Sequence, residues 1–351
     1  MNGFEKSLHN KNDAARRIRD LLTGDTPQCV SIIGERRIGK SSLAWRVFHQ
    51  VKKQKNTRAV FLDCDGLSQQ CNSKEQFFQR LNQGFGEDNP AGEEPGKTLF
   101  QDYSTFKNFI GGNGRRGEKT IIFLDEFEHL PDKGFADDTF FSNLRSMANH
   151  PGNLLALVTI SKTPLKELIH DAIQGSNFWN IFSNEIIGLL DHDSIMKLRE
   201  KGFKRSQFSL SGEEIEEIHY YAGDFPFFNQ IACGFLWETK AGKDALDWDN
   251  LEVAIFPHYE KLWKDRTKEE KKILKRLSSE DAEKPELKDM WTRGLVIKNQ
   301  QCLNPFSGYF SHLLESTFKI PRKKISLKAC IRYIIDLLYI RKAAKEALSG
   351  K

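Results

Sequence analysis

Five short apolar runs punctuate the first 190 residues, and polar segments long enough to form helices separate them. Nearly continuous apolar runs of this kind are typical of parallel strands that helices cover on both faces. We therefore predict an α/β domain with three layers, helix–sheet–helix. The glycine-rich residues 111–117 predict a loop ahead of the third strand. The strands are expected near residues 29–33, 58–63, 119–125, 154–160 and 184–189.

After Leu190 the strand-like runs stop and the pattern becomes helical. The sequence from Ser211 to Glu214 has the form of a capping box, which marks the start of a helix. Further on, an amphipathic helix near 267–277, a second helix from 285 and a short hairpin follow one another, as in a winged helix. We predict four parts: an α/β core at 1–190, a helical lid at 191–262, a winged-helix domain at 263–320 and a basic, apolar C-terminal helix at 321–351.

Composition narrows the class of protein. The chain has 351 residues, of which 39% are hydrophobic and 29% charged, as in a globular protein. No run of about 18 apolar residues occurs and the N-terminus has no apolar signal core, so we expect neither a membrane partner nor secretion. The six cysteines form no CxxC pair, which favours reduced thiols in the cytoplasm over a disulfide framework or a zinc site.

The net charge of +5 is uneven. Residues 321–351 hold nine Lys or Arg against two Asp or Glu, which gives 9 − 2 = +7 and leaves −2 for the rest of the chain. An anionic partner would therefore meet the C-terminus rather than the α/β core.

The strongest chemical signal follows the first predicted strand. Gly34 to Ser41 reads G-x-x-x-x-G-K-S between a strand and a helix, which is the P-loop in its required context. Glycines let the backbone wrap a phosphate, and the helix dipole faces the same anion. Lys40 is expected to reach the β- and γ-phosphates, and the Ser41 hydroxyl to ligate Mg²⁺. The predicted nucleotide-binding residues of this loop are Gly34, Arg37, Ile38, Gly39, Lys40, Ser41 and Ser42.

A second motif follows the third predicted strand. The apolar run from Thr120 ends in Asp125 and Glu126, where the chain leaves the sheet. This is the pattern of a Walker B element, in which Asp125 holds Mg²⁺ opposite Ser41, usually through water. Glu126 is expected to orient and deprotonate the water that attacks the γ-phosphate. Alone this motif is common, but its pairing with a P-loop makes it specific.

These motifs resemble the STAND-type NTPases and the related archaeal-type ATPases on the AAA+ side of the P-loop superfamily. The form G-E-R-R-I-G-K-S-S-L from Gly34 is similar to the family pattern G-x-R-R-x-G-K-[ST]-S-L. The resemblance covers nearly the whole chain through about residue 320.

The resemblance implies three further site residues. Asn10 lies where the family has its adenine-side motif, with Asn10 and Lys11 in place of Gly and Arg. Lys162 stands in place of the Arg of the sensor strand, keeps its charge and lacks its bidentate fork. Pro226 resembles the proline of the lid motif GGxP. An ordinary surface lysine and a helix-start proline are the alternative interpretations of the last two.

The resemblance implies a slow ATPase that uses ATP or ADP with Mg²⁺ as a molecular switch. Glu126, Lys40 and Lys162 are its expected catalytic residues. ATP is expected to change the conformation and drive self-association, and a protein partner would supply the sensor or effector of a signalling or defence system. Two other functions stay open: a DNA-acting AAA+ loader or transposition-type regulator that binds DNA through the winged helix or basic tail, and a nucleotide-gated scaffold without hydrolysis.

Overall fold

The structure is a computed structural model, and it describes most of the chain between residues 11 and 316. The described ranges are 11–66, 71–87, 99–131, 134–172, 175–203, 208–242, 248–275, 277, 285–299 and 302–316. Asn10 and the predicted C-terminal helix at 321–351 therefore lie outside the described residues. None of the helices in these ranges is long and apolar enough to cross a membrane.

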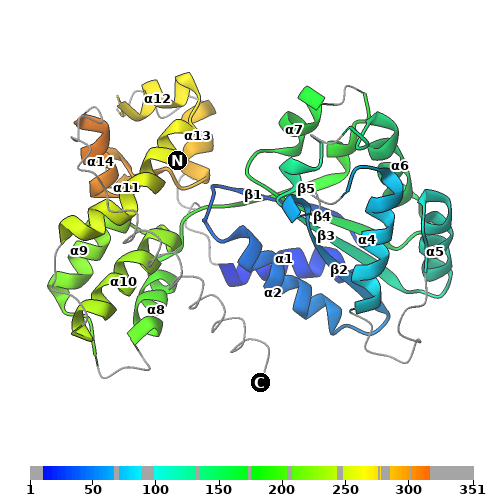
Figure 1. Cartoon of the computed structure of the whole chain (residues 1–351), viewed down its shortest axis with the longest axis horizontal. Coiled ribbons are helices and arrows are strands. Elements are labelled where there is room, and N and C mark those ends of the chain that lie inside the picture. Colours follow the sequence, from blue (N-terminus) through cyan, green and yellow to red (C-terminus); the bar gives the residue numbers. More distant parts are fainter. Residues whose placement is uncertain are drawn as a thin grey trace. The chain divides into compact units, whose positions relative to one another are not determined.

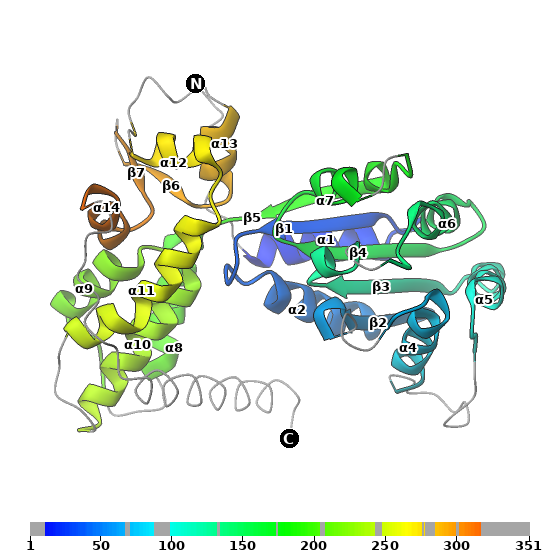
Figure 2. The same cartoon turned by 45° about the horizontal axis from the view of Figure 1, so that its top comes forward.

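A five-stranded parallel sheet forms the centre of the first unit, with strand order β2-β3-β4-β1-β5 (Figures 1 and 2). Every residue of β1 and of β4 is buried, as expected for central parallel strands. The predicted strands are confirmed, with β3 matching at both ends and β5 starting two residues earlier than expected. Their bounds are β1 Cys29–Gly34, β2 Thr57–Asp63, β3 Lys119–Asp125, β4 Leu155–Ser161 and β5 Phe182–Ile187.

Side chains alternate between the two faces of the sheet, and each face has its own helices. On one face Phe61 of β2 and Phe123 of β3 pack against Phe48 of α2, with ring centroids 5.7 Å from Phe48 in both pairs. On the other face Val60 and Ile122 join a core with helices α4, α5 and α6. The helices of this unit are α1 Lys11–Thr23, α2 Lys40–Lys52, α4 Lys74–Glu87, α5 Tyr103–Arg115, α6 Asp138–Asn149 and α7 Leu165–Ala172, with 3₁₀ turns η1 Phe127–His129 and η2 Phe178–Ile181.

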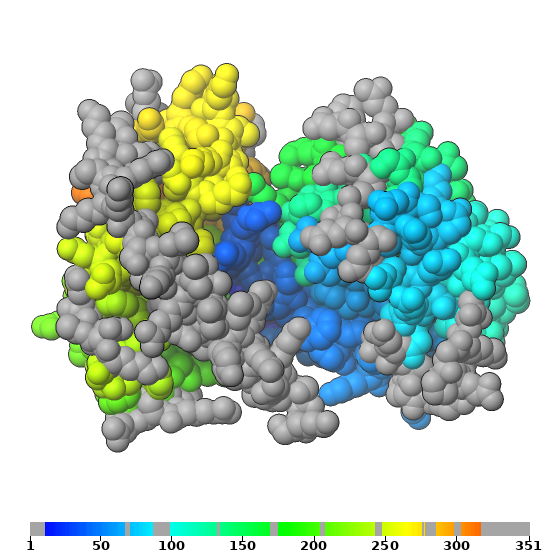
Figure 3. All heavy atoms as spheres, in the orientation of Figure 1, coloured from blue at the N-terminus to red at the C-terminus, as the bar shows by residue number. Residues whose placement is uncertain are grey.

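The loop predicted for residues 111–117 is largely helical, because α5 continues to Arg115. A glycine is needed there for packing rather than for a turn. A Cβ on Gly114 would collide with the carbonyl oxygen of Gly152, so the glycine lets the helix approach that backbone closely. In Figure 3 α4 and α5 form the cyan surface of this unit, where they shield the sheet from solvent.

The second unit is mainly helical and contains a small antiparallel hairpin, which one further helix follows. Among the described residues it holds those of 196–224, 228–288 and 296–316, whereas 225–227 and 289–295 cluster with the first unit. The predicted helices and hairpin are confirmed; the winged-helix assignment and the domain boundaries stay predictions. The elements are α8 His192–Phe203, α9 Gly212–Ala222, α10 Pro226–Lys240, α11 Trp248–Lys264, α12 Lys268–Lys275, α13 Pro285–Thr292, β6 Val296–Asn299, β7 Cys302–Pro305 and α14 Gly308–Glu315.

Tyr259 of α11 lies at the centre of this unit and has no exposed surface. Its hydroxyl is 2.6 Å from the Tyr221 carbonyl oxygen and 2.9 Å from the Ser307 hydroxyl, so it joins α9 and α14. Phe228 stacks on its ring with centroids 4.1 Å apart. Gly223, with φ +50°, is required because a Cβ there would collide with the Phe306 carbonyl oxygen.

Candidate active site

The loop that joins β1 to α2 owes its shape to two glycines. A Cβ at Gly34 would collide with the Ile187 carbonyl oxygen on the neighbouring strand β5. Gly39 has φ +102° and is the N-cap of α2, a left-handed conformation that L side chains rarely adopt. Ile38 between them is fully buried and anchors the loop. Both glycines of the motif therefore have a structural reason for their positions.

The first turn of α2 is suited to an anion. The helix begins at Lys40, and no side chain caps its N-terminus at Gly39. The first N–H groups of a helix have no partner within the helix, and the helix dipole makes this end positive. Ser41 and Ser42 belong to this turn. A phosphate bound here would satisfy donors that the fold itself leaves open.

Lys40 lies in an environment that disfavours a charge without a bound anion. Its ammonium donates a hydrogen bond to the Glu35 carbonyl oxygen at 3.1 Å. Burial lowers the pKa of Lys40, and the nearby carboxylates of Glu128 and Glu126 offset this only in part. A phosphate chain would supply the negative charge that stabilises the protonated lysine.

Ser41 and Asp125 meet at the carboxyl edge of the sheet. The Ser41 hydroxyl donates a hydrogen bond to Asp125 Oδ1 at 3.2 Å, although 84 residues separate them in the sequence. Burial raises the pKa of Asp125, which is the environment of a carboxylate that a cation can stabilise. Hydroxyl and carboxylate oxygens are the ligands that Mg²⁺ prefers, so this pair fits the ion that the P-loop motif implies.

Glu126 follows directly and adopts a left-handed backbone, with φ 50° and ψ 43°. Its N–H donates to Asp125 Oδ1 at 3.0 Å. A non-glycine residue in this conformation costs of order 1–3 kcal/mol and persists where the surroundings impose it. Here Phe127, fully buried and stacked on Phe178, holds the turn η1 in place. The turn fixes the Glu126 backbone beside the candidate cation ligands.

Glu128, which the sequence interpretation did not single out, also belongs to this cluster. Its Oε2 atom is buried and has no hydrogen-bond partner among the described residues. Among the carboxylates near Lys40 it has the largest effect on the pKa of that lysine. The sequence shows acidic residues at both 126 and 128, but an acidic residue shortly after a strand is too common to mark a functional site.

Lys11, at the start of α1, reaches the P-loop from outside the motif. Its ammonium donates a hydrogen bond to the Ile38 carbonyl oxygen at 2.8 Å. A Cβ at Gly39 would collide with the same ammonium, so Lys11 lies directly over the loop. Burial lowers the pKa of Lys11 to about 8. The signal in the sequence was weak, because only its place in an imperfect family motif marked Lys11.

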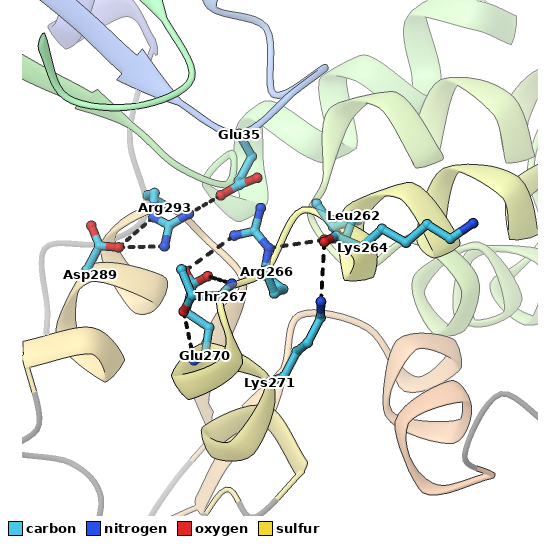
Figure 4. A network of polar contacts seen from close by, with 9 residues as sticks. All are labelled: Glu35, Leu262, Lys264, Arg266, Thr267, Glu270, Lys271, Asp289 and Arg293. Carbon is cyan, nitrogen blue, oxygen red and sulfur yellow. Dashed lines mark hydrogen bonds and ion pairs between the residues drawn. The ribbon is translucent and has the colours of Figure 1, made fainter. Parts of the chain in front are cut away.

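Two residues far along the chain also contact the P-loop within the first unit. Figure 4 shows the Arg293 guanidinium bridging Glu35 of the loop and Asp289 of α13. The Glu35 side chain is only 1% exposed, so this ion pair is screened from water. Arg37 lies over the ring of Phe227, 4.2 Å from its centroid, in a cation–π contact. No pattern in the sequence predicts either contact.

The second unit contains a separate polar network, also drawn in Figure 4. Thr267 and Glu270 form a reciprocal cap at the start of α12, with N–H donors 2.7 and 3.1 Å from their side-chain acceptors. Arg266 pairs with Glu270 at 3.6 Å and donates to the Leu262 carbonyl oxygen at 3.0 Å. This network joins α11 to α12.

The residues that the family resemblance marked are placed as follows. Lys162 comes directly after β4, the strand between β1 and β3, and is half-buried. Pro226 is buried and opens α10, next to the Phe227 that contacts Arg37. Asn10 lies outside the described residues. The structure thus brings together Lys40, Ser41, Asp125 and the Glu126 backbone, whereas the roles of Lys162 and Pro226 stay predictions.

Two family models match overlapping parts of the chain. Residues 23–169 match the AAA domain model, and residues 113–272 match the model of Novel STAND NTPase 2. Comparison with curated protein sequences gives no match. The resemblance inferred from the P-loop and Walker B motifs is thereby confirmed.

Solved structures with a similar fold include a Walker-type ATPase of Pyrococcus abyssi, with a TM-score of 0.60 and 15% identity over 89% of this chain and 97% of that one. The ORC2 protein of Aeropyrum pernix, solved in ADPNP–ADP complexes, gives a TM-score of 0.50 and 14% identity, covering 90% of this chain and 95% of that one. The ORC1 protein of Aeropyrum pernix in complex with DNA gives a TM-score of 0.50 and 13% identity, covering 94% of this chain and 83% of that one. At these identities the likeness shows the fold, while the family models and motifs identify a P-loop NTPase of the AAA+ type.

Proposed function

We propose that this P-loop NTPase of the AAA+ type binds Mg²⁺–ATP at the carboxyl edge of its sheet, hydrolyses it slowly to ADP and acts as a nucleotide-controlled switch. The contact between the Ser41 hydroxyl and Asp125 Oδ1, at 3.2 Å, is the observation that carries the proposal. It joins the P-loop to the Walker B strand, as a Mg²⁺–nucleotide site requires.

Each residue has a defined part in this proposal. The loop N–H groups and Lys40 bind the phosphates, and Ser41 and Asp125 hold Mg²⁺, which neutralises charge on the phosphate oxygens. Glu126 orients the attacking water and accepts its proton. Attack of the water oxygen on the γ-phosphorus breaks its bond to the bridging oxygen, which gives inorganic phosphate and ADP as the leaving group, with the new terminal oxygens of ADP close to Lys40. Lys162 contacts the γ-phosphate as a point charge, and without the fork of an arginine its stabilisation is weaker, which supports a slow rate.

The switch function rests on the family match and on the contacts of the P-loop. Glu35 contacts Arg293, and Arg37 contacts Phe227, so residues that alternate along the loop are held by distant segments. A ligand that shifts the loop would alter both contacts. We propose that ATP binds with Pro226 nearby and changes these contacts, and that the chain then self-associates. A protein partner in the cytoplasm would supply the signal or the effector of a signalling or defence system.

A DNA-acting loader or regulator is the second candidate. The net charge of +7 over residues 321–351 favours it, and one similar structure is an ORC1 protein in complex with DNA. In this alternative the predicted winged helix or the basic tail would contact phosphates, and binding would weaken steeply with salt.

Steady-state ATP hydrolysis, with and without duplex DNA, tests these functions against each other. We expect slow Mg²⁺-dependent turnover by the wild type that DNA does not change, and no turnover by Glu126→Gln, which should still bind ATP and form a larger assembly. Stimulation by DNA that vanishes at high salt would favour the loader. Tight ATP binding without turnover in the wild type would favour the third function, a nucleotide-gated scaffold without hydrolysis. Turnover by Glu126→Gln at the wild-type rate would exclude Glu126 as the base.

A further inference from the structure

Lys11 is a partly buried cation that lies on the P-loop without belonging to it. Its side chain extends from the first residue of α1 to the Ile38 carbonyl oxygen, across 27 residues of sequence. Its ammonium also lies so close to Gly39 that a Cβ on that residue would collide with it. Gly39 immediately precedes the helix whose open N–H groups form the anion site. Lys11 is thus positioned over the same part of the loop that a phosphate chain would contact.

Within the described part of the chain, no carboxylate compensates the charge of Lys11. An ammonium has three donors, and the Ile38 carbonyl accepts one of them. Burial alone lowers the pKa of Lys11, with no opposing effect from a carboxylate among the described residues. The charged or titratable groups of the elements around it are Asp13, Arg16, Arg17, Arg19 and Asp20 on α1, Glu35, Arg36 and Arg37 in the loop, and Lys40, Arg46, His49 and Lys52 on α2.

A purely structural role does not account for this arrangement. A neutral donor such as a glutamine amide could bond the Ile38 carbonyl without the cost of burying a charge. Buried charges in proteins are normally paired, and this one lacks a counter-ion in the described part of the chain. The partner that its position fits is an anion bound by the P-loop.

We propose that Lys11 is a second phosphate-binding lysine, which leaves the Ile38 carbonyl and pairs with the phosphate chain of the nucleotide held by the P-loop. This proposal rests on the proposed nucleotide binding and adds a residue from outside the motif. It assigns Lys11 to the phosphates rather than to the base or the ribose.

Proton uptake is the distinctive consequence. With a pKa of about 8, Lys11 is about half deprotonated at pH 8 in the empty protein. Pairing with a phosphate favours the protonated form, so binding near pH 8 should take up protons from the buffer. The share of Lys11 is obtained from Lys11→Arg, which keeps the charge and does not titrate in this range.

Calorimetric titrations at pH 8 with Mg²⁺–ATP and with pyrophosphate test the proposal. Each titration is made in Tris and in HEPES, because these buffers differ in their heat of ionisation and the difference in binding heat gives the number of protons taken up. Lys11→Gln should bind both ligands at least about tenfold more weakly, as for loss of a hydrogen bond between charged groups. Lys11→Arg should restore affinity to within about threefold and take up fewer protons than the wild type. Lys53→Gln, at the exposed far end of α2, removes the same charge and should bind as the wild type does.

The outcomes separate the two proposals. If Lys11→Gln binds both ligands as tightly as the wild type while Lys40→Ala loses both, the role of Lys11 is wrong and the proposed nucleotide site stands. If Lys11→Gln weakens the binding of ATP but leaves the binding of pyrophosphate unchanged, Lys11 contacts the base or the ribose, which also overturns the proposal. Wild-type affinity in Lys40→Ala would instead overturn the nucleotide site itself.

Discussion

The ion pair between Glu35 and Arg293 allows the sharpest prediction on stability. Glu35 is the first residue of the P-loop after Gly34, and its carbonyl oxygen accepts the hydrogen bond from Lys40. Its carboxylate pairs with Arg293, which comes directly after α13. The proposed perturbation is Arg293→Met, which keeps an aliphatic side chain of similar reach and removes the guanidinium.

The expected magnitude follows from the exposure of the two partners. The Glu35 side chain is 1% exposed and that of Arg293 12% exposed, so water can replace the guanidinium only in part. Removing one partner of a buried pair typically costs about 3–5 kcal/mol, because a charge stays buried without compensation. We expect the lower end, about 3 kcal/mol, since some water reaches the position of Arg293. Asp289, the second partner of Arg293, is 49% exposed and rehydrates at little cost.

A double-mutant cycle isolates the pair. Arg293→Met, Glu35→Gln and the double variant are compared by urea unfolding, with hydrogen exchange of the β1 and α2 amides as a readout confined to the first unit. The double variant should be more stable than the sum of the single effects predicts, with a coupling energy of about 2 kcal/mol, because glutamine leaves no buried charge behind. The cycle measures the pair alone, even though both residues have other contacts.

Additive effects, or a cost below about 1 kcal/mol for Arg293→Met, would refute the reasoning, since exposed ion pairs contribute amounts of that size. Such a result would mean that the Glu35 carboxylate is solvated in solution. A loss of about 3 kcal/mol with strong coupling would instead establish that a residue 258 positions away stabilises the P-loop.

Two further variants test the P-loop glycine Gly34 and the neighbouring Lys11. Gly34→Ala should destabilise the fold by about 3 kcal/mol in thermal unfolding, because the new Cβ meets the Ile187 carbonyl oxygen of β5, whereas Gly86→Ala, with open space around it, should be neutral or stabilising. Lys11→Met should stabilise the empty protein by about 3 kcal/mol at pH 7, since lowering a pKa from 10.5 to about 8 costs about 1.4 kcal/mol per pKa unit. Between pH 8 and pH 10.5 the unfolded wild type binds more protons than the folded form, so the stability of the wild type rises with pH. The stability difference between Lys11→Met and the wild type should therefore disappear over this range. A difference that does not depend on pH would contradict the burial of a charged Lys11.

The sheet and the motifs could be predicted because their signals are local. The apolar run of β3 ends at Asp125 in both the sequence pattern and the structure, since a parallel strand that is covered on both faces consists mainly of apolar residues. The glycines of the P-loop are explained by contacts with β5 and by a left-handed N-cap, which the motif alone does not state.

What could not be predicted depends on contacts distant in sequence. Residues 111–117 contain enough glycine to predict a loop, but the approach of α5 to Gly152 uses Gly114 inside a helix. The contact of Arg293 with Glu35 follows no periodic or motif pattern, and the imperfect family motif that includes Lys11 does not predict its contact with Ile38. Burial, which makes these side chains important, is known only once the tertiary structure is known.

The central claim is that the loop from Gly34 to Ser41 binds nucleotide. Equilibrium titration of Mg²⁺–ATP into the wild type and Lys40→Ala, with Lys53→Gln as a charge-matched control, tests it most directly. We predict saturable binding by the wild type and Lys53→Gln and none by Lys40→Ala, because the phosphate chain then loses its principal counter-charge in the loop. Equal affinity in all three proteins would contradict the assignment of this loop as the nucleotide site.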